Sequence, residues 1–207
     1  MKAIIEQAIQ SAISFETYKT LFEKLVEEGR TTGSNQSEGY VSYTKLNWSR
    51  YKRAEKHVQL SESTIFQLQS IETPITLLII TEAWCGDASQ ALPVIEKMET
   101  ISSNLTAKLV LRDEHEALMN LFLTNGAKAI PKIIALDNKF NVVGTWGPRP
   151  SELQQKVVEF KIQKPTATGI DISSMTQKWY NENRGAAIQY ELLEMISQLE
   201  VKLDIIN

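Results

Sequence analysis

The feature that most constrains this chain is an apolar run that begins directly after a proline. Residues 75–80 follow Pro74 and read ITLLII, with Thr76 as the only polar member. A run of this length without polar alternation is typical of a strand that is covered on both faces. It is far too short to cross a bilayer, which takes about 20 residues. We therefore predict a central strand of an α/β sheet and no membrane span.

Strands and helices alternate after this run. The spacing of apolar residues predicts helices over 88–98, 114–123 and 153–160, and strands over 107–111, 133–136 and 142–146, with a turn at Asp137-Asn138. The resulting order is β-α-β-α-β-β-α, which is typical of an α/β fold that ends in a hairpin and a helix.

The N-terminal third is predicted to be helical. Apolar residues at intervals of three and four between Phe15 and Leu25 indicate an amphipathic helix that ends at Gly29. Residues 30–39 (RTTGSNQSEG) have the composition of a mobile loop, which predicts a linker or flap. Asn47 is the expected N-cap of a helix that runs to residue 58, and Ser61 that of another over 62–71.

The C-terminal part predicts one long or broken helix. Apolar residues recur at helical spacing from Met175 to Leu199, and Gly185 is the expected break. We therefore expect a helical N-terminal extension over 1–73, an α/β core over 74–163, and a C-terminal helical extension over 164–207 that packs on the core.

The chain contains a single cysteine and two histidines. One cysteine forms neither an internal disulfide nor a cysteine-rich zinc site, and two isolated histidines do not indicate a metal site. We therefore expect no metal and no cofactor. Stability must come from packing, at about 25 cal/mol per Å² of apolar surface buried.

The charge balance excludes an obvious polyanionic partner. Lys and Arg total 22 against 25 Asp and Glu, which gives a net charge of −3. A nucleic-acid-binding chain would show a basic excess or a basic face. Glu6 and Gln7 interrupt the apolar start, so a secretory signal is not expected, and we predict a cytoplasmic location. The oligomeric state has no signal in the sequence.

The cysteine lies in the segment Trp84-Cys85-Gly86-Asp87-Ala88, between the predicted central strand and the next helix. A helix N-terminus stabilises a thiolate and can lower a cysteine pKa from about 8.5 to roughly 3.5–7.5. The ends of strands in open α/β sheets are also where such folds place their sites. We therefore expect a partly accessible, reactive thiol, and the alternative is a buried, inert cysteine.

This segment resembles the active-site turn of the thioredoxin superfamily, in particular of bacterial thioredoxin-like proteins that read W-C-G-D-C. Pro93 follows Cys85 by eight residues, as does the helix-kinking proline of thioredoxins. Ala129-Ile130-Pro131 resembles the family's cis-proline loop, and Thr145-Trp146-Gly147 resembles the end of its last strand. The resemblance covers residues 75 to about 160.

The resemblance implies a thioredoxin-like three-layer sandwich in which Pro131 is cis and faces the cysteine. It implies that Cys85 is the catalytic thiol. It also implies that substrate binds along Trp84, Gly86, Asp87, Ile130 and Pro131. The partner would be a protein or small-molecule disulfide.

Two positions depart from the family. Ala88 occupies the place of the resolving cysteine, so a dithiol cycle within the chain is impossible. Ile79 occupies the place of the family's buried acid, and Glu82, the nearest acid, is expected to be exposed. We therefore predict monothiol thiol-disulfide exchange completed by a low-molecular-weight thiol. The alternative is a redox-inactive binding module that uses the groove near Trp84 and Pro131.

Other polar and aromatic residues have a simpler expected role. Asp87 is expected to be an acid at a helix start, although it could also modulate the thiol. Trp179 and Tyr180 are expected to pack in the core. The basic stretch is expected to be a solvated helix face rather than an anion site; it comprises Arg50, Lys52, Arg53, Lys56 and His57.

Overall fold

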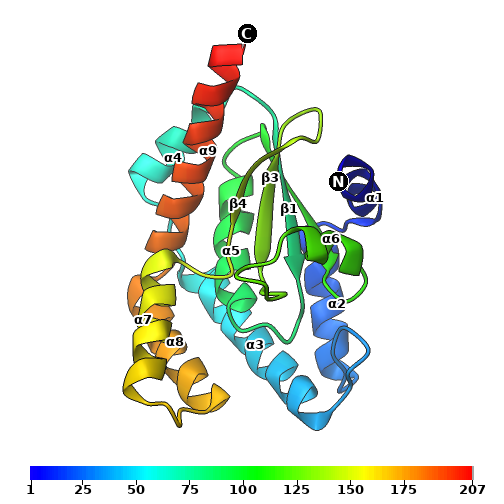
Figure 1. The fold of residues 1–207 in the computed structure, drawn as a ribbon, viewed down its shortest axis with the longest axis vertical. Coiled ribbons are helices and arrows are strands. Elements are labelled where there is room, and N and C mark those ends of the chain that lie inside the picture. The colour runs from blue at the N-terminus through cyan, green and yellow to red at the C-terminus, as the bar shows by residue number, and fades with distance from the viewer. Residues whose placement is uncertain (207) are drawn as a thin grey trace.

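The computed structural model describes residues 1–206, with side chains through residue 198. A four-stranded sheet lies between α5 and α9 on one side and α1, α2 and α6 on the other (Figure 1). The helices are α1 Lys2–Ser11, α2 Phe15–Glu27, α3 Glu38–His57, α4 Glu62–Gln69, α5 Ala88–Glu99, α6 Glu116–Leu121, α7 Ser151–Gln163, α8 Gly169–Asn183 and α9 Ala186–Ile206. The strands are β1 Ile75–Thr81, β2 Leu105–Leu111, β3 Lys132–Leu136 and β4 Val142–Trp146.

The sheet has the strand order β2-β1-β3-β4, with β1 inside it. Strand β1 pairs parallel with β2 and antiparallel with β3, and β3 pairs antiparallel with β4. Residues Leu77 to Ile80 of β1 are completely buried, because helices cover both faces of the strand. The predicted central strand, the element order and the α/β fold class are confirmed.

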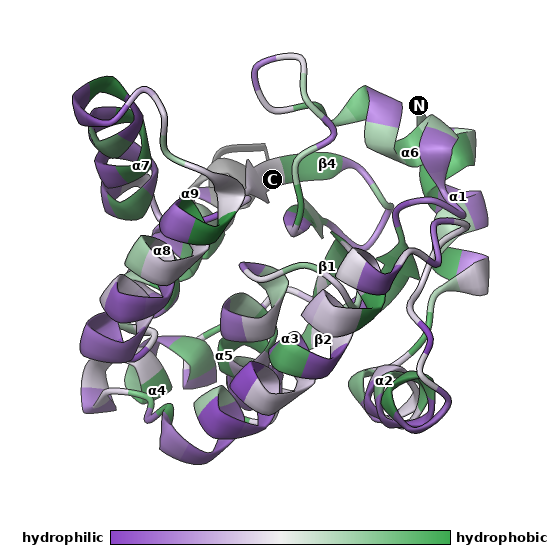
Figure 2. Cartoon of the chain, turned by 90° about the horizontal axis from the view of Figure 1, so that it is seen from below, coloured by the Kyte–Doolittle hydropathy of each residue, from purple (hydrophilic) through white to green (hydrophobic). Residues whose placement is uncertain are grey.

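One hydrophobic core joins the N-terminal helices to the sheet. Phe22 of α2 contacts the rings of Trp48 and Tyr51 of α3, at centroid distances of 5.0 and 6.3 Å. Helix α3 in turn packs along α5, which follows the central strand. Helix α3 is therefore part of the wall around the end of β1. Figure 2 shows α3 and α5 side by side.

The start of α3 differs from the sequence prediction. Ser61 caps α4 as predicted, because its hydroxyl accepts a hydrogen bond from the Thr64 N–H at 3.0 Å. Asn47 is not an N-cap, because α3 already begins at Glu38 and Asn47 is buried within it. Its side-chain Nδ2 donates to the carbonyl of Trp84 at 2.8 Å. A polar residue that resembled a helix cap is thus a tether for the cysteine turn.

Residues 30–37 form a loop, but not the expected linker or flap. Thr31 and Thr32 are buried, and the Thr32 hydroxyl accepts a hydrogen bond from the Ala83 N–H at 3.0 Å. The side chain of Gln36 donates to the carbonyls of Thr31 and Gly33. These contacts hold the loop against the end of β1. The polar composition of the loop had instead indicated a mobile segment.

The C-terminal helix breaks where the sequence predicts. Arg184 and Gly185 both have positive φ, of 52° and 84°, and separate α8 from α9. A Cβ on Gly185 would lie 2.7 Å from Cγ2 of Val94, so both the backbone and the packing favour glycine there. None of the helices within residues 1–206 is long and apolar enough to cross a membrane.

Candidate functional site

Cys85 lies in the turn between β1 and α5, but its thiol is buried. The residue is 7% exposed, and Sγ donates to the carbonyl of Ile130 at 3.2 Å. The pKa of Cys85 is raised to about 12, with burial as the largest cause and the nearby Asp87 carboxylate as the second. The N–H groups of Ala88 and Asp87 and the charge of Arg149 act in the opposite direction. The expectation of a partly accessible thiol is therefore wrong.

The Ile130-Pro131 peptide bond is cis, as the resemblance implies. Both residues are buried, and the Ile130 carbonyl is occupied by the Cys85 thiol. The proline loop thus closes over the sulfur. Its assignment to substrate binding stays a prediction.

Asp87 joins three separate parts of the chain. Its Oδ2 accepts from Nη2 of Arg149 at 2.6 Å, and its Oδ1 accepts from the hydroxyl of Tyr180 at 2.8 Å. Asp87 is the N-cap residue of α5, which agrees with the predicted acid at a helix start, but its carboxylate makes no capping hydrogen bond to the helix. Burial raises the pKa of Asp87, against the opposing effects of Arg149 and Tyr180. Tyr180 is buried as predicted, but its hydroxyl also anchors the turn.

Trp84 is half-buried between two side chains from other elements. The ring of Tyr40 meets it edge-on at a centroid distance of 5.1 Å, and the Arg112 guanidinium lies 4.7 Å from its ring centre. Asn47 fixes its carbonyl. The turn is therefore braced by α3 on one side and by the segment after β2 on another.

A pocket of about 340 Å³ lies over this turn and is called the turn pocket below. Its lining comes from α3, the turn, Arg149 and α8, and comprises Tyr40, Tyr43, Arg50, Trp84, Gly86, Asp87, Arg149, Gly169, Ile172, Ser173, Thr176, Gln177 and Tyr180. Three of the predicted site residues, Trp84, Gly86 and Asp87, are among them. Cys85, Ile130 and Pro131 are not part of the lining.

Arg50 is a pocket residue that the sequence analysis assigned to a solvated face. Its Nη1 donates to Oδ1 of Asn47 at 3.1 Å, and its Nη2 donates to the hydroxyl of Ser173 at 3.3 Å. Burial lowers the pKa of Arg50. Tyr43, Asn47 and Arg50 are spaced by four and three residues, which places them on one face of a helix. This spacing became informative only with the start of α3 at Glu38, because the sequence prediction began the helix at Asn47.

Comparisons with known proteins identify the family and support the fold. A family model described as Thioredoxin matches residues 33–166, which is more than half of the chain. The chain belongs to the thioredoxin family. None of the curated proteins compared with it matches.

Two solved structures resemble this thioredoxin-family chain in fold. One is a protein of unknown function from Pseudomonas aeruginosa, with 17% identity, coverage of 92% of this chain and 95% of that chain, and a TM-score of 0.61. The other is an HIV epitope-scaffold, with 19% identity, coverage of 89% and 98%, and a TM-score of 0.55. At these identities the likeness shows the fold alone.

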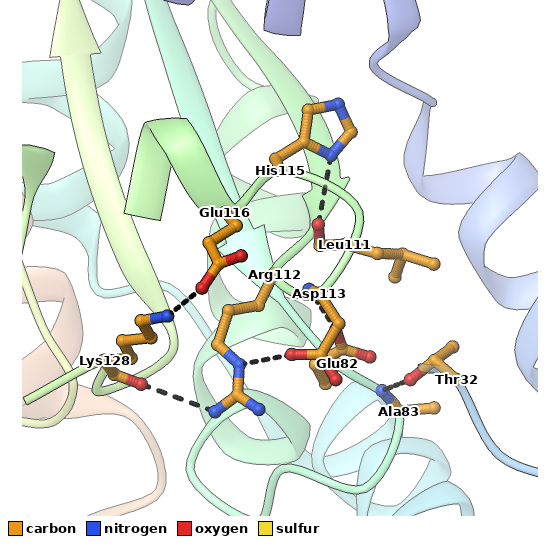
Figure 3. A network of polar contacts seen from close by, with 9 residues as sticks. All are labelled: Thr32, Glu82, Ala83, Leu111, Arg112, Asp113, His115, Glu116 and Lys128. Atoms are coloured by element: carbon orange, nitrogen blue, oxygen red, sulfur yellow. Dashed lines mark hydrogen bonds and ion pairs between the residues drawn. The ribbon is translucent and has the colours of Figure 1, made fainter. Parts of the chain in front are cut away.

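Glu82 departs from the expectation of an exposed acid. It is completely buried, and its Oε1 accepts from the N–H of Asp113 at 2.9 Å (Figure 3). Burial raises the pKa of Glu82, while the hydrogen bonds from Thr32 and Asp113 oppose the rise. Arg112 and Asp113 pair beside it at 2.8 Å. In this thioredoxin-family chain the acid thus links the end of β1 to the segment after β2.

Metal chemistry has no evident centre in the part of the chain that the structure describes. No three His, Cys, Asp or Glu side chains converge there as a candidate metal site.

Proposed function

We propose that this thioredoxin-family protein is a binding module that keeps Cys85 as an unreactive thiol and takes a small ligand in the turn pocket. The observation that carries the proposal is the division of the turn into two faces. The sulfur lies inside, hydrogen-bonded to the Ile130 carbonyl. Trp84, Gly86 and Asp87 line the pocket outside.

The thiol chemistry supports a redox-inactive resting state. Only the thiolate attacks a disulfide, and burial raises the pKa of Cys85 to about 12. At pH 7 a thiol with that pKa is ionised about once in 10⁵ molecules. Ala88 in the resolving position would also leave any mixed disulfide without an internal thiol to release it.

The location of the pocket supports binding over α3 and α8 rather than in the groove near Trp84 and Pro131. Pro131 is buried beneath its neighbours, whereas Trp84 is half-buried at the pocket wall. Arg50 and Ser173, which are far apart in sequence, meet across the pocket at 3.3 Å. A concave site with aromatic walls and a few polar groups is typical of small-molecule binding.

Monothiol exchange is the second candidate, and one observation favours it. The N–H groups of Asp87 and Ala88 lower the pKa of Cys85, as they would stabilise a thiolate once the turn opened. In that reaction the thiolate attacks a substrate disulfide, one half leaves as a thiolate that takes up a proton, and an external thiol then releases Cys85 from the mixed disulfide.

Mixed-disulfide formation distinguishes the two candidates. The native protein is incubated at pH 7.5 with oxidised glutathione and, separately, with the neutral bis(2-hydroxyethyl) disulfide, and adducts are followed by mass spectrometry. We expect an adduct in 8 M urea and little or none in native buffer over the same time. The Cys85→Ser variant controls for modification elsewhere. Rapid, complete modification of the native protein would contradict the binding-module proposal and favour exchange.

A further inference from the structure

The turn pocket contains one more positive charge than negative charge among its lining residues. Arg50 and Arg149 are cationic and Asp87 is the single carboxylate. Asp87 pairs with Arg149 at 2.6 Å. Arg50 has only neutral hydrogen-bond partners, Asn47 and Ser173, and forms no ion pair within the described residues. The charge of Asp87 also stabilises the Arg50 cation, but Asp87 forms its ion pair with Arg149 and is the single carboxylate that faces both guanidinium groups. A second anion in the pocket would give Arg50 an ion-pair partner of its own, which a partly buried cation favours.

On this ground we propose that the turn pocket binds a small organic carboxylate, a monoanion with an aromatic or apolar body, and that Arg50 is its anion-binding residue. This inference rests on the proposed function, since it names the ligand class of the same pocket.

The guanidinium of Arg50 has donors to spare. It carries five N–H groups, and the contacts to Asn47 and Ser173 use one each. The remaining N–H groups suit the two oxygens of a carboxylate, which arginine binds as a fork. Asn47 and Ser173 fix the plane of the guanidinium in advance. Arg149 also lines the pocket, and its buried Nε has no hydrogen-bond partner within the described residues.

The charge balance favours a carboxylate over a phosphate monoester. Two guanidinium groups and one carboxylate leave a net charge of about +1, which a single negative charge neutralises. A phosphate monoester carries about −1.5 to −2 at pH 7. Its excess negative charge would lie close to the Asp87 carboxylate, which is itself fixed in the pocket by Arg149 and Tyr180.

The rest of the wall favours an apolar body of modest size. Tyr40, Tyr43, Trp84 and Ile172 contribute ring and aliphatic surface. The volume of about 340 Å³ is at the small end of the roughly 300–1,000 Å³ that ligand pockets span. A single ring with a carboxylate fits this description better than a nucleotide or an extended peptide.

The test measures binding of benzoate and phenylacetate to the full chain by isothermal titration calorimetry. The neutral amides benzamide and phenylacetamide, together with phenyl phosphate, serve as ligand controls. We expect the carboxylates to bind at least tenfold more tightly than their amides and more tightly than phenyl phosphate. The Arg50→Met variant is expected to lose at least tenfold in carboxylate affinity. The Arg53→Met variant, at an exposed position of the same helix, is expected to bind as the wild type does.

A second variant keeps the proposal testable if Arg50→Met does not fold. Thr176→Phe fills the pocket from α8 without a change of charge, and Ser174→Phe places the same ring at an exposed position of that helix. We expect the first to abolish carboxylate binding and the second to preserve it.

Each remaining outcome has a defined meaning. Amides that bind as tightly as carboxylates, or phenyl phosphate that binds more tightly, would overturn the carboxylate inference while the pocket remained a binding site. Absence of carboxylate binding would overturn it as well. Failure of the binding-module proposal is detected separately, by rapid mixed-disulfide formation at native Cys85.

Discussion

Replacement of Asp87 by asparagine is the sharpest test of how the turn controls the thiol. The Asp87 carboxylate raises the pKa of Cys85, whereas the charge of Arg149 lowers it. Asparagine keeps the size of the side chain and an oxygen for Tyr180, but removes the negative charge. Arg149 is then no longer neutralised by its partner at 2.6 Å. Both effects lower the pKa of Cys85, so the sign of the change is fixed by the structure.

The expected decrease in the pKa of Cys85 is modest, because Asp87 is only the second cause of its rise. The pKa of Cys85 rises from 9.0 to about 12, with burial as the largest cause and Asp87 second. Burial is unchanged in Asp87→Asn, so we expect recovery of only about one pKa unit, at the low end of the effect of a nearby charge. That gives about tenfold more thiolate at a given pH. A thiolate of lower pKa is also less nucleophilic, with a Brønsted coefficient of about 0.4–0.5, so the rate of exchange rises about threefold to fourfold.

The assay is the pH dependence of the reaction of native Cys85 with the neutral disulfide 4,4′-dithiodipyridine, read by absorbance between pH 7 and 10. Circular dichroism at each pH verifies that the variant is folded. Glu23→Gln, which removes a charge from an exposed position of α2, is the matched control and is expected to react as the wild type does. An unchanged or slower rate in folded Asp87→Asn would refute the assignment of Asp87 as a group that suppresses the thiolate.

Three further predictions concern the turn and its supports. Ala88→Cys, at a buried position, is expected to form an internal disulfide with Cys85 on oxidation but to gain little insulin-reducing activity, and a clear gain would favour the exchange candidate. Gly185→Ala is expected to lower the free energy of unfolding by about 1–3 kcal/mol in urea titrations, because Gly185 has a φ of 84° and an added Cβ would lie 2.7 Å from Val94. Its control is Gly39→Ala within α3, where a Cβ meets nothing within 4 Å and which is expected to stabilise the protein by up to about 1 kcal/mol. Equal effects of the two substitutions would refute the packing argument. Burial raises the pKa of Glu82 in the folded state, so folding takes up a proton, and wild-type stability falls as pH rises from the ordinary carboxyl pKa through the raised value. Glu82→Gln is expected to lack this fall in urea titrations across pH 4–8. A pH profile of the variant parallel to that of the wild type would contradict the prediction.

Local patterns in the sequence determined most of the fold. The apolar run after Pro74 predicted β1 because a strand covered on both faces has no polar alternation. The hydroxyl of Ser61 predicted the start of α4, and Gly185 the break between α8 and α9, because caps and positive φ depend on neighbouring residues. The position of Cys85 between strand and helix also followed from the sequence, and the cis bond at Pro131 from the family resemblance.

The tertiary structure alone decided what the turn is able to do. The sequence placed Arg50 on a solvated basic helix face, but in the tertiary structure Arg50 donates a hydrogen bond to Ser173, 123 residues away, and lines the turn pocket. The sequence placed Asp87 at a helix start, but only the tertiary structure brought Tyr180, 93 residues away, to donate a hydrogen bond to its carboxylate. Cys85 and Glu82 are buried by segments from distant parts of the chain, and that burial raises the pKa of each group. Helical and strand periodicity records which face of an element is apolar, but desolvation and charge pairing depend on which distant groups meet that face.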